Sequence, residues 1–414
     1  MESAVSIEHA KHALMVFGLI LMLGTLSGLL ARLTKIPDVV IFLLAGMGVG
    51  PAGLNWVDIP ATSELNQLIL IFGSSYILFD GGASLRFKVM KEVWITVAVI
   101  STVGVLITAT ITGYAARDIL GVPLIVALLL GATLASTDPA TLVPIFKQVR
   151  IKDRVAQTIM SESAFNDAMG AIVTFTVLAI AMGQATFSVG ASLLELGWQT
   201  GVGIGAGAVL GFIAAAVIAH EKYGFLADYS RLVTLMAVIA AYIGADGLHA
   251  SGFMAVFVFG MMLGNMDALG FAVGEREQEE MEDFISTTGL IMRMFIFVML
   301  GSQVDFALMG KYAVGGALVV AVLMFVARPV TVFACALVDR RARWSFKEML
   351  FMCWTRETGV IPAALAGMLV GMKAPGAEMI ASVVFVAILM TILIQATTTK
   401  WLGAKLGLLH RGSH

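Results

Sequence analysis

Residues 156–183 read AQTIMSESAFNDAMGAIVTFTVLAIAMG, an almost wholly apolar stretch that contains two carboxylates, Glu162 and Asp167. As a helix this stretch would exceed the hydrocarbon core of a bilayer, which is about 30 Å thick. The rest of the chain has the same character, because 59% of its 414 residues are hydrophobic, 13% are charged and the mean hydropathy is +0.94. Soluble proteins carry about 25% charged residues. The composition therefore predicts an all-α polytopic membrane protein and excludes soluble enzymes and nucleic-acid-binding proteins.

Apolar runs between charged or Pro/Gly-rich breaks predict thirteen membrane helices. Their expected ranges are 13–33, 37–50, 66–84, 93–116, 122–146, 156–183, 190–219, 230–246, 249–268, 284–303, 312–338, 347–372 and 377–402. The run at 37–50 is short for a full span. The first run lacks a basic leader and a cleavage site, so we expect a true span and not a signal peptide.

The distribution of Lys and Arg predicts the orientation, since cytoplasmic loops carry the excess. With thirteen spans, nineteen Lys and Arg fall in one set of alternate loops and four in the other, counting the N-terminal tail. We therefore expect an integral protein of the cell (inner) membrane with its N-terminus outside and its C-terminus in the cytoplasm. The final residues, 411–414, have the composition of an affinity-tag remnant.

Six ionisable residues lie deep within the predicted spans. Such residues are costly unless they are paired or line a wet cavity, so each is a functional hypothesis. They are Asp138, Glu162, Asp167, Arg328, Arg356 and Glu357.

The sixth predicted span gathers several oxygen-bearing side chains. Helical spacing places Ser163 and Asp167 on one face, and Glu162 and Asn166 on the adjoining face. Hard oxygen donors of this kind suit a small alkali cation, and a partly desolvated carboxylate also binds a proton more readily than one in water. For Glu162 we favour a structural role, in which an arginine holds it, and for Asp167 we favour the exchange of protons.

Two predicted spans contain polar interruptions close to a proline. Thr137-Asp138-Pro139 interrupts the fifth span, and Thr355-Arg356-Glu357-Thr358-Gly359 precedes Pro362 in the twelfth. Broken helices in both halves of a chain are typical of inverted-repeat transporters. We therefore expect two inverted six-helix repeats, with the seventh span as linker and unwound helices in spans 5 and 12.

These motifs resemble the cation:proton antiporter family, in its NhaP/NHE sodium/proton exchanger branch. The resemblance rests on Thr137-Asp138-Pro139, on Glu162-Ser163 followed by Asn166-Asp167, on Phe79-Asp80-Gly81-Gly82, and on Arg356 before Gly359-Val360-Ile361-Pro362. The match in the order of these motifs extends over essentially the whole chain. Two departures stand out, because the family's arginine is normally followed directly by glycine and Asp80 stands where Glu is frequent.

The resemblance implies a single transmembrane antiporter domain over residues 1–410, with core and dimerisation subdomains, in a homodimer with an elevator-like movement. It implies that Asp167 binds the cation (Na⁺) and the proton, with Asp138, Ser163 and Thr137 near the ion. Asn166 would hold the unwound region, Glu162 would pair with Arg328, and Arg356 would be the second arginine of the site.

The expected activity is exchange of Na⁺ or Li⁺ for H⁺, one for one, without a cofactor. An Asn at position 166, where electrogenic relatives carry Asp, implies the electroneutral stoichiometry. K⁺/H⁺ exchange by the same fold is an alternative that these residues leave open, and a cation channel is a less favoured one, because the sequence shows no repeated pore loop. The expected partners are monovalent cations, protons, the lipid bilayer and a second copy of the chain, but no nucleic acid.

Overall fold

A computed structural model describes residues 2–34, 37–137, 151–184, 188–219, 226–271 and 274–409, and these residues fold into helices joined by short loops. The helices are α1 (Glu2–Thr34), α2 (Asp38–Val49), α3 (Glu64–Ala83), α4 (Phe87–Leu120), α5 (Leu124–Thr133), α7 (Asp153–Ala181), α8 (Val189–Ala219), η1 (Ala227–Tyr229), α9 (Ser230–Asp246), α10 (Gly252–Leu263), η2 (Asp267–Leu269), α11 (Glu275–Ser302), α12 (Phe306–Val322), η3 (Leu323–Ala327), α13 (Arg328–Ala336), α14 (Phe346–Trp354), α15 (Val360–Gly371), α16 (Ala377–Met390), η4 (Thr391–Ala396) and α17 (Thr397–Leu406). The all-α prediction is confirmed for the described residues.

Each of the thirteen expected ranges overlaps at least one of these helices. Eight helical stretches of the described chain are long and apolar enough to cross a membrane. They are Ala10–Ala31, Met90–Leu120, Asp153–Ala181, Gly190–Ala219, Ala227–Asp246, Gln278–Ser302, Phe306–Ala336 and Ala377–Leu406. Shorter apolar helices are α2, α5, α10 and α15, so the number of crossings remains a prediction.

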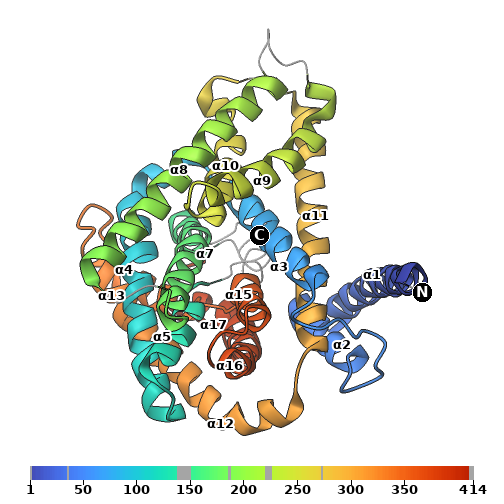
Figure 1. Ribbon diagram of the computed structural model, residues 1–414. Helices are drawn as coiled ribbons and strands as arrows, with labels where there is room; N and C mark the ends of the chain where they lie inside the picture. Colours follow the sequence, from blue (N-terminus) through green and yellow to red (C-terminus); the bar gives the residue numbers. More distant parts are fainter. Residues whose placement is uncertain are drawn as a thin grey trace.

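The helices pack as two groups (Figure 1). The site bundle contains α4, α5, α7 and the helices from α12 to α17, in which α4 contacts α5, α7, α12 and α13. The flanking bundle contains α1, α2, α3, α8, α9, α10 and α11, in which α10 packs on α3 and α8, and α11 packs on α2 and α3. The two bundles meet where α3 and α11 contact α15, and where α7 contacts α3, α8 and α10.

The span expected at 312–338 differs from the prediction at its start and in its interior, for clear local reasons. The helix expected to begin at residue 312 begins at Phe306, because the Asp305 carboxylate accepts hydrogen bonds from the amides of Ala307 (2.8 Å) and Leu308 (3.0 Å). The same span changes to a π-helical turn at Leu323–Ala327, just before Pro329, whose missing N–H cannot continue the α-helical pattern. This turn sets the position of Arg328.

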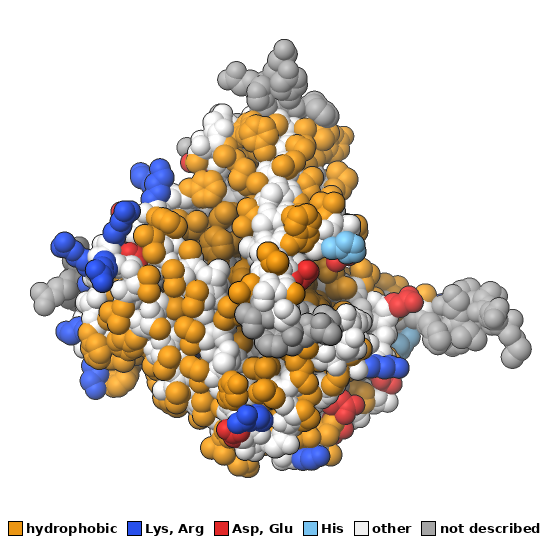
Figure 2. Space-filling view, turned by 60° about the vertical axis from the view of Figure 1, so that its left-hand side comes forward, with side chains coloured by type: hydrophobic (Ala, Val, Ile, Leu, Met, Phe, Trp, Pro, Cys, Tyr) orange, Lys and Arg blue, Asp and Glu red, His pale blue; other side chains and the backbone are white. Residues whose placement is uncertain are grey.

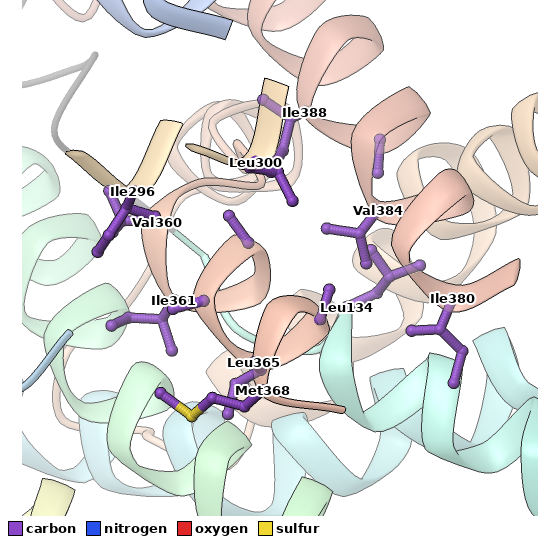
Figure 3. Packing of buried hydrophobic residues seen from close by; sticks show 14 of the residues in the cluster. Leu134, Ile296, Leu300, Val360, Ile361, Leu365, Met368, Ile380, Val384 and Ile388 are labelled. Atoms are coloured by element: carbon purple, nitrogen blue, oxygen red, sulfur yellow. The ribbon is translucent and has the colours of Figure 1, made fainter. Parts of the chain in front are cut away.

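The helix α15 is deeply enclosed, with ten of its twelve residues buried. Figure 3 shows Val360, Ile361, Leu365 and Met368 of α15 packed among side chains of three other segments. These side chains include Ile380, Val384 and Ile388 of α16, Ile296 and Leu300 of α11, and Leu134 beyond α5. This apolar packing holds α15 in place and so positions residues 355–359, which precede it.

The outer surface is apolar, as expected for helices that face lipid. Figure 2 shows hydrophobic side chains covering most of the visible face, with Lys and Arg gathered mainly along one edge. Large apolar residues such as Leu194 (77% exposed) and Val314 (74% exposed) point away from the protein. A contiguous apolar surface of this extent is characteristic of a membrane interface.

Candidate ion-binding site

The end of α5 is joined to α7 by a compact hydrogen-bond network. After α5 ends at Thr133, the chain continues without helical structure to Thr137. The Thr137 amide donates to Asn166 Oδ1 (3.0 Å), and Asn166 Nδ2 donates to Thr137 Oγ1 (2.9 Å). The Ser163 hydroxyl donates to the Thr137 carbonyl, and the hydroxyls of Thr137 and Ser163 are 3.1 Å apart. Three of the predicted site residues therefore lie together.

Asp167 follows this network directly on α7. It lies one residue after Asn166 and one helical turn after Ser163, so its carboxylate shares a face with the Ser163 hydroxyl. All four residues are buried, and Asp167, at 7% exposed, is the most accessible of them. The arrangement places one carboxylate beside hydroxyl, amide and backbone oxygens inside the protein.

A glycine makes the close approach of these segments possible. The ideal Cβ position of Gly170, one turn beyond Asn166, lies 3.0 Å from Ser136 Cβ. A larger residue there would push α7 away from the segment that carries Thr137.

Glu162 is neutralised by an arginine from another helix. Arg328 makes a forked contact with Glu162, in which Nη1 reaches Oε1 and Nη2 donates to Oε2 (2.9 Å). Arg328 Nε also donates to the Met352 carbonyl (3.0 Å). Both side chains are almost fully buried, so the pair ties α7 to α13 and α14. This is the pairing that the resemblance implied.

The second interruption lies between α14 and α15. Residues 355–359 are not helical, and Arg356 Nη2 donates to the carbonyl of Leu134, beside the end of α5. The Thr358 amide donates to Thr391 Oγ1 (3.0 Å) in the π-helical turn η4. The two interrupted segments are thus in direct contact, and Glu357 is buried next to Arg356.

One predicted ligand, Asp138, lies outside the described residues, so its part in the site remains a prediction. Of the other seven, the structure joins Thr137, Ser163 and Asn166 in one network, with Asp167 beside it. Glu162 and Arg328 form a second cluster, and Arg356 holds the end of α5.

Sequence reasoning missed the backbone partners of this site. The carbonyls of Leu134 and Met352 accept hydrogen bonds from Arg356 and Arg328, respectively. Every residue has a backbone carbonyl, so the residue type does not indicate which carbonyls act in this way. Thr391 was also missed, although a threonine and Gln395 within the last predicted span were a visible signal.

Comparison with known proteins identifies the family of this chain. Residues 18–405 match the family described as "Sodium/hydrogen exchanger, transmembrane". The Na⁺/H⁺ antiporter 1 of Methanocaldococcus jannaschii is 34% identical over 358 residues, covering 84% of this chain and 81% of that protein. A K⁺/H⁺ antiporter NhaP of Alkalimonas amylolytica is 27% identical over 409 residues, covering 95% of this chain and 67% of that protein.

A solved structure has the same fold. The sodium proton antiporter MjNhaP1 from Methanocaldococcus jannaschii, at pH 8, superimposes with a TM-score of 0.82 at 30% identity, covering 98% of this chain and 99% of that one. The chain therefore belongs to the sodium/hydrogen exchanger family of integral, multi-pass membrane proteins, in the NhaP branch of the cation:proton antiporters.

Proposed function

We propose that this protein exchanges Na⁺ or Li⁺ for H⁺ across the membrane, one for one, by alternating access at Asp167. The observation that carries the proposal is the placement of the Asp167 carboxylate one turn from Ser163 on α7, where Ser163 and Asn166 hold Thr137. A carboxylate, a hydroxyl and a backbone carbonyl are ligands that a dehydrated alkali cation prefers. Asp138 would complete this set.

The mechanism needs only competition for one carboxylate. With Glu162 bound to Arg328, the charge that changes during transport is that of Asp167. A proton or a cation neutralises it, and the neutral site then crosses the low-dielectric interior at a much smaller cost than the charged one. Because Asn166 is neutral, each crossing carries one positive charge in either direction, and exchange is electroneutral.

The two bundles, which meet along α3, α11 and α15, are the two bodies that would move against each other during alternating access. The site bundle would move against the flanking bundle, which would form the homodimer. We place the N-terminus outside and the C-terminus in the cytoplasm.

K⁺/H⁺ exchange is the second candidate, because one relative is a K⁺/H⁺ antiporter and the same oxygen donors serve a larger ion. Purified protein in liposomes with an imposed pH gradient and a clamped membrane potential separates the two. We expect Na⁺ and Li⁺ to collapse the gradient and K⁺ not to do so. Collapse of the gradient by K⁺ alone would show that the protein is a K⁺/H⁺ exchanger. Potential-driven currents far above exchanger turnover would indicate a channel.

A further inference from the structure

A hollow of about 180 Å³ lies at one end of the boundary between the two bundles. The flanking bundle contributes Ala61, Leu300 and Gln303 to its lining, and the site bundle contributes Gly367, Glu378 and Ser382. Asp305, at the junction of α11 and α12, also lines it. A hollow shared by two groups of helices changes shape whenever they move against each other.

This end of the molecule is the one that we expect to face outside. The loops here belong to the set with few basic residues, and two exposed carboxylates, Asp305 and Glu378, border the hollow. Carboxylates at the mouth of a cleft raise the local concentration of cations.

Beside the hollow, α3 closes against α15. Gln67 Nε2 donates to the Ala61 carbonyl of its own bundle (2.8 Å) and lies 3.4 Å from the Gly367 carbonyl of the other bundle. A methyl group on Gly371 would overlap the Gln67 amide, and one on Gly367 would lie 2.6 Å from Leu70 Cδ1. Gln67 and Leu70, one turn apart on α3, therefore rest directly on the backbone of α15 at Gly371 and Gly367.

The contact between α3 and α15 has the properties of a gate, because it is close but weakly bonded. Gln67 is held firmly on the flanking side, whereas its bond across the boundary is long, and the two glycines offer no side chains that interlock with α3. Near the other end of α3 the fit is looser, because a methyl group on Gly81 would meet only Ala164 of α7, at 3.7 Å. At these positions along α3, the contact with the site bundle is thus closer at the proposed outer end.

We propose that the contact of Gln67 with Gly367 and Gly371 is the outer gate of the cation pathway, and that the hollow beside it is the entrance for a monovalent cation from outside. This inference rests on the proposed function. Opening requires α15 to move away from Gln67, which joins the hollow to the boundary that leads inward past Leu70.

A disulfide across the boundary tests the gate. In Gln67→Cys/Gly371→Cys the clashing amide is gone and both side chains face each other. We expect oxidation to lower cation/proton exchange in liposomes at least tenfold, and reduction to restore it. The matched control is Thr108→Cys/Thr331→Cys, whose parent hydroxyls lie 2.9 Å apart within the site bundle. Its oxidation should leave exchange unchanged.

The outcomes separate the gate from the function. Full exchange by the oxidised Gln67→Cys/Gly371→Cys protein, with the cross-link shown by mass spectrometry, would overturn the gate and leave the function standing. Absence of exchange in the unsubstituted protein would instead contradict the proposed function.

A second measurement does not depend on a cross-link. Leu70 is 3% exposed and lies just inside Gln67, so Leu70→Cys reports whether the gate opens. In right-side-out vesicles, we expect adding Gln67→Ala to raise its alkylation by an impermeant maleimide at least threefold. The parent chain, whose cysteines Cys335 and Cys353 are buried, sets the background. Equal alkylation with and without Gln67→Ala would contradict the proposal.

Discussion

The side chain of Asn166 holds Thr137 by two hydrogen bonds: Oδ1 accepts from the Thr137 amide (3.0 Å), and Nδ2 donates to the Thr137 hydroxyl (2.9 Å). The segment that follows α5 is therefore fixed to α7 at the residue directly before Asp167. An amide that can donate and accept at once suits this position better than a carboxylate, which can only accept.

Asn166→Ala should release Thr137 and leave its buried amide without a partner, at a cost of about 1–3 kcal/mol. We expect the apparent KM for Na⁺ to rise at least tenfold. The matched control is Asn265→Ala in the flanking bundle, because Asn265 also bonds the backbone, at Leu85 (2.7 Å) and Phe87 (2.8 Å). An equal rise in KM in both variants would show that Asn166 acts only through stability.

Ser163→Ala should weaken cation binding without abolishing exchange, because it removes one oxygen donor and leaves Asp167 in place. A lost hydroxyl ligand worth about 1 kcal/mol corresponds to a rise in KM of about fivefold. Ser161→Ala, two residues earlier on another face of α7, should leave KM unchanged. Initial rates of Na⁺-driven proton movement measure both, and an unchanged KM in Ser163→Ala would exclude this hydroxyl as a ligand.

Breaking the Glu162–Arg328 pair should destabilise the protein by about 3–5 kcal/mol, since the remaining charge is buried without its partner. We expect Glu162→Gln and Arg328→Met each to have a lower melting temperature in detergent than the parent protein, in line with this loss of stability. The double variant should recover much of the loss. If the double variant loses as much as the two single losses added together, the two residues do not act as a pair.

The loop after α13 allows a prediction about the dependence of stability on pH. Burial raises the pKa of Asp339, but hydrogen bonds from Thr96, Ala342 and Arg341 outweigh that effect and hold the pKa below its usual value. A lowered folded-state pKa contributes stability above the unfolded value of about 4, and this contribution is lost as pH falls through the folded value.

We therefore expect Asp339→Asn to melt at a lower temperature than the parent protein near neutral pH, with a gap that narrows below about pH 4. The exposed Asp228→Asn is the control and should follow the parent protein at every pH. A gap that stays constant down to about pH 3 would show that the charge of Asp339 does not stabilise the fold.

Sequence reasoning reached the class of fold and the helices, because hydrophobic runs and the scarcity of charge depend on residue types alone. The resemblance to the antiporter family implied that Thr137, Ser163 and Asn166 lie near one another, and in the structure these three side chains form one network. The beginning of α12 at Phe306 was missed, because it depends on the cap formed by Asp305. The arginine contacts with the carbonyls of Leu134 and Met352 were missed because they depend on tertiary packing.

Competition between Na⁺ and H⁺ for Asp167 is the central claim, and the dependence of the apparent KM for Na⁺ on pH tests it most directly. In liposomes with the membrane potential clamped, we expect KM to rise by up to about tenfold for each unit that pH falls, at constant maximal rate, as mass action requires for two ligands of one site. Asp167→Asn should show no exchange at any pH. A KM independent of pH, or exchange that persists in Asp167→Asn, would contradict the account.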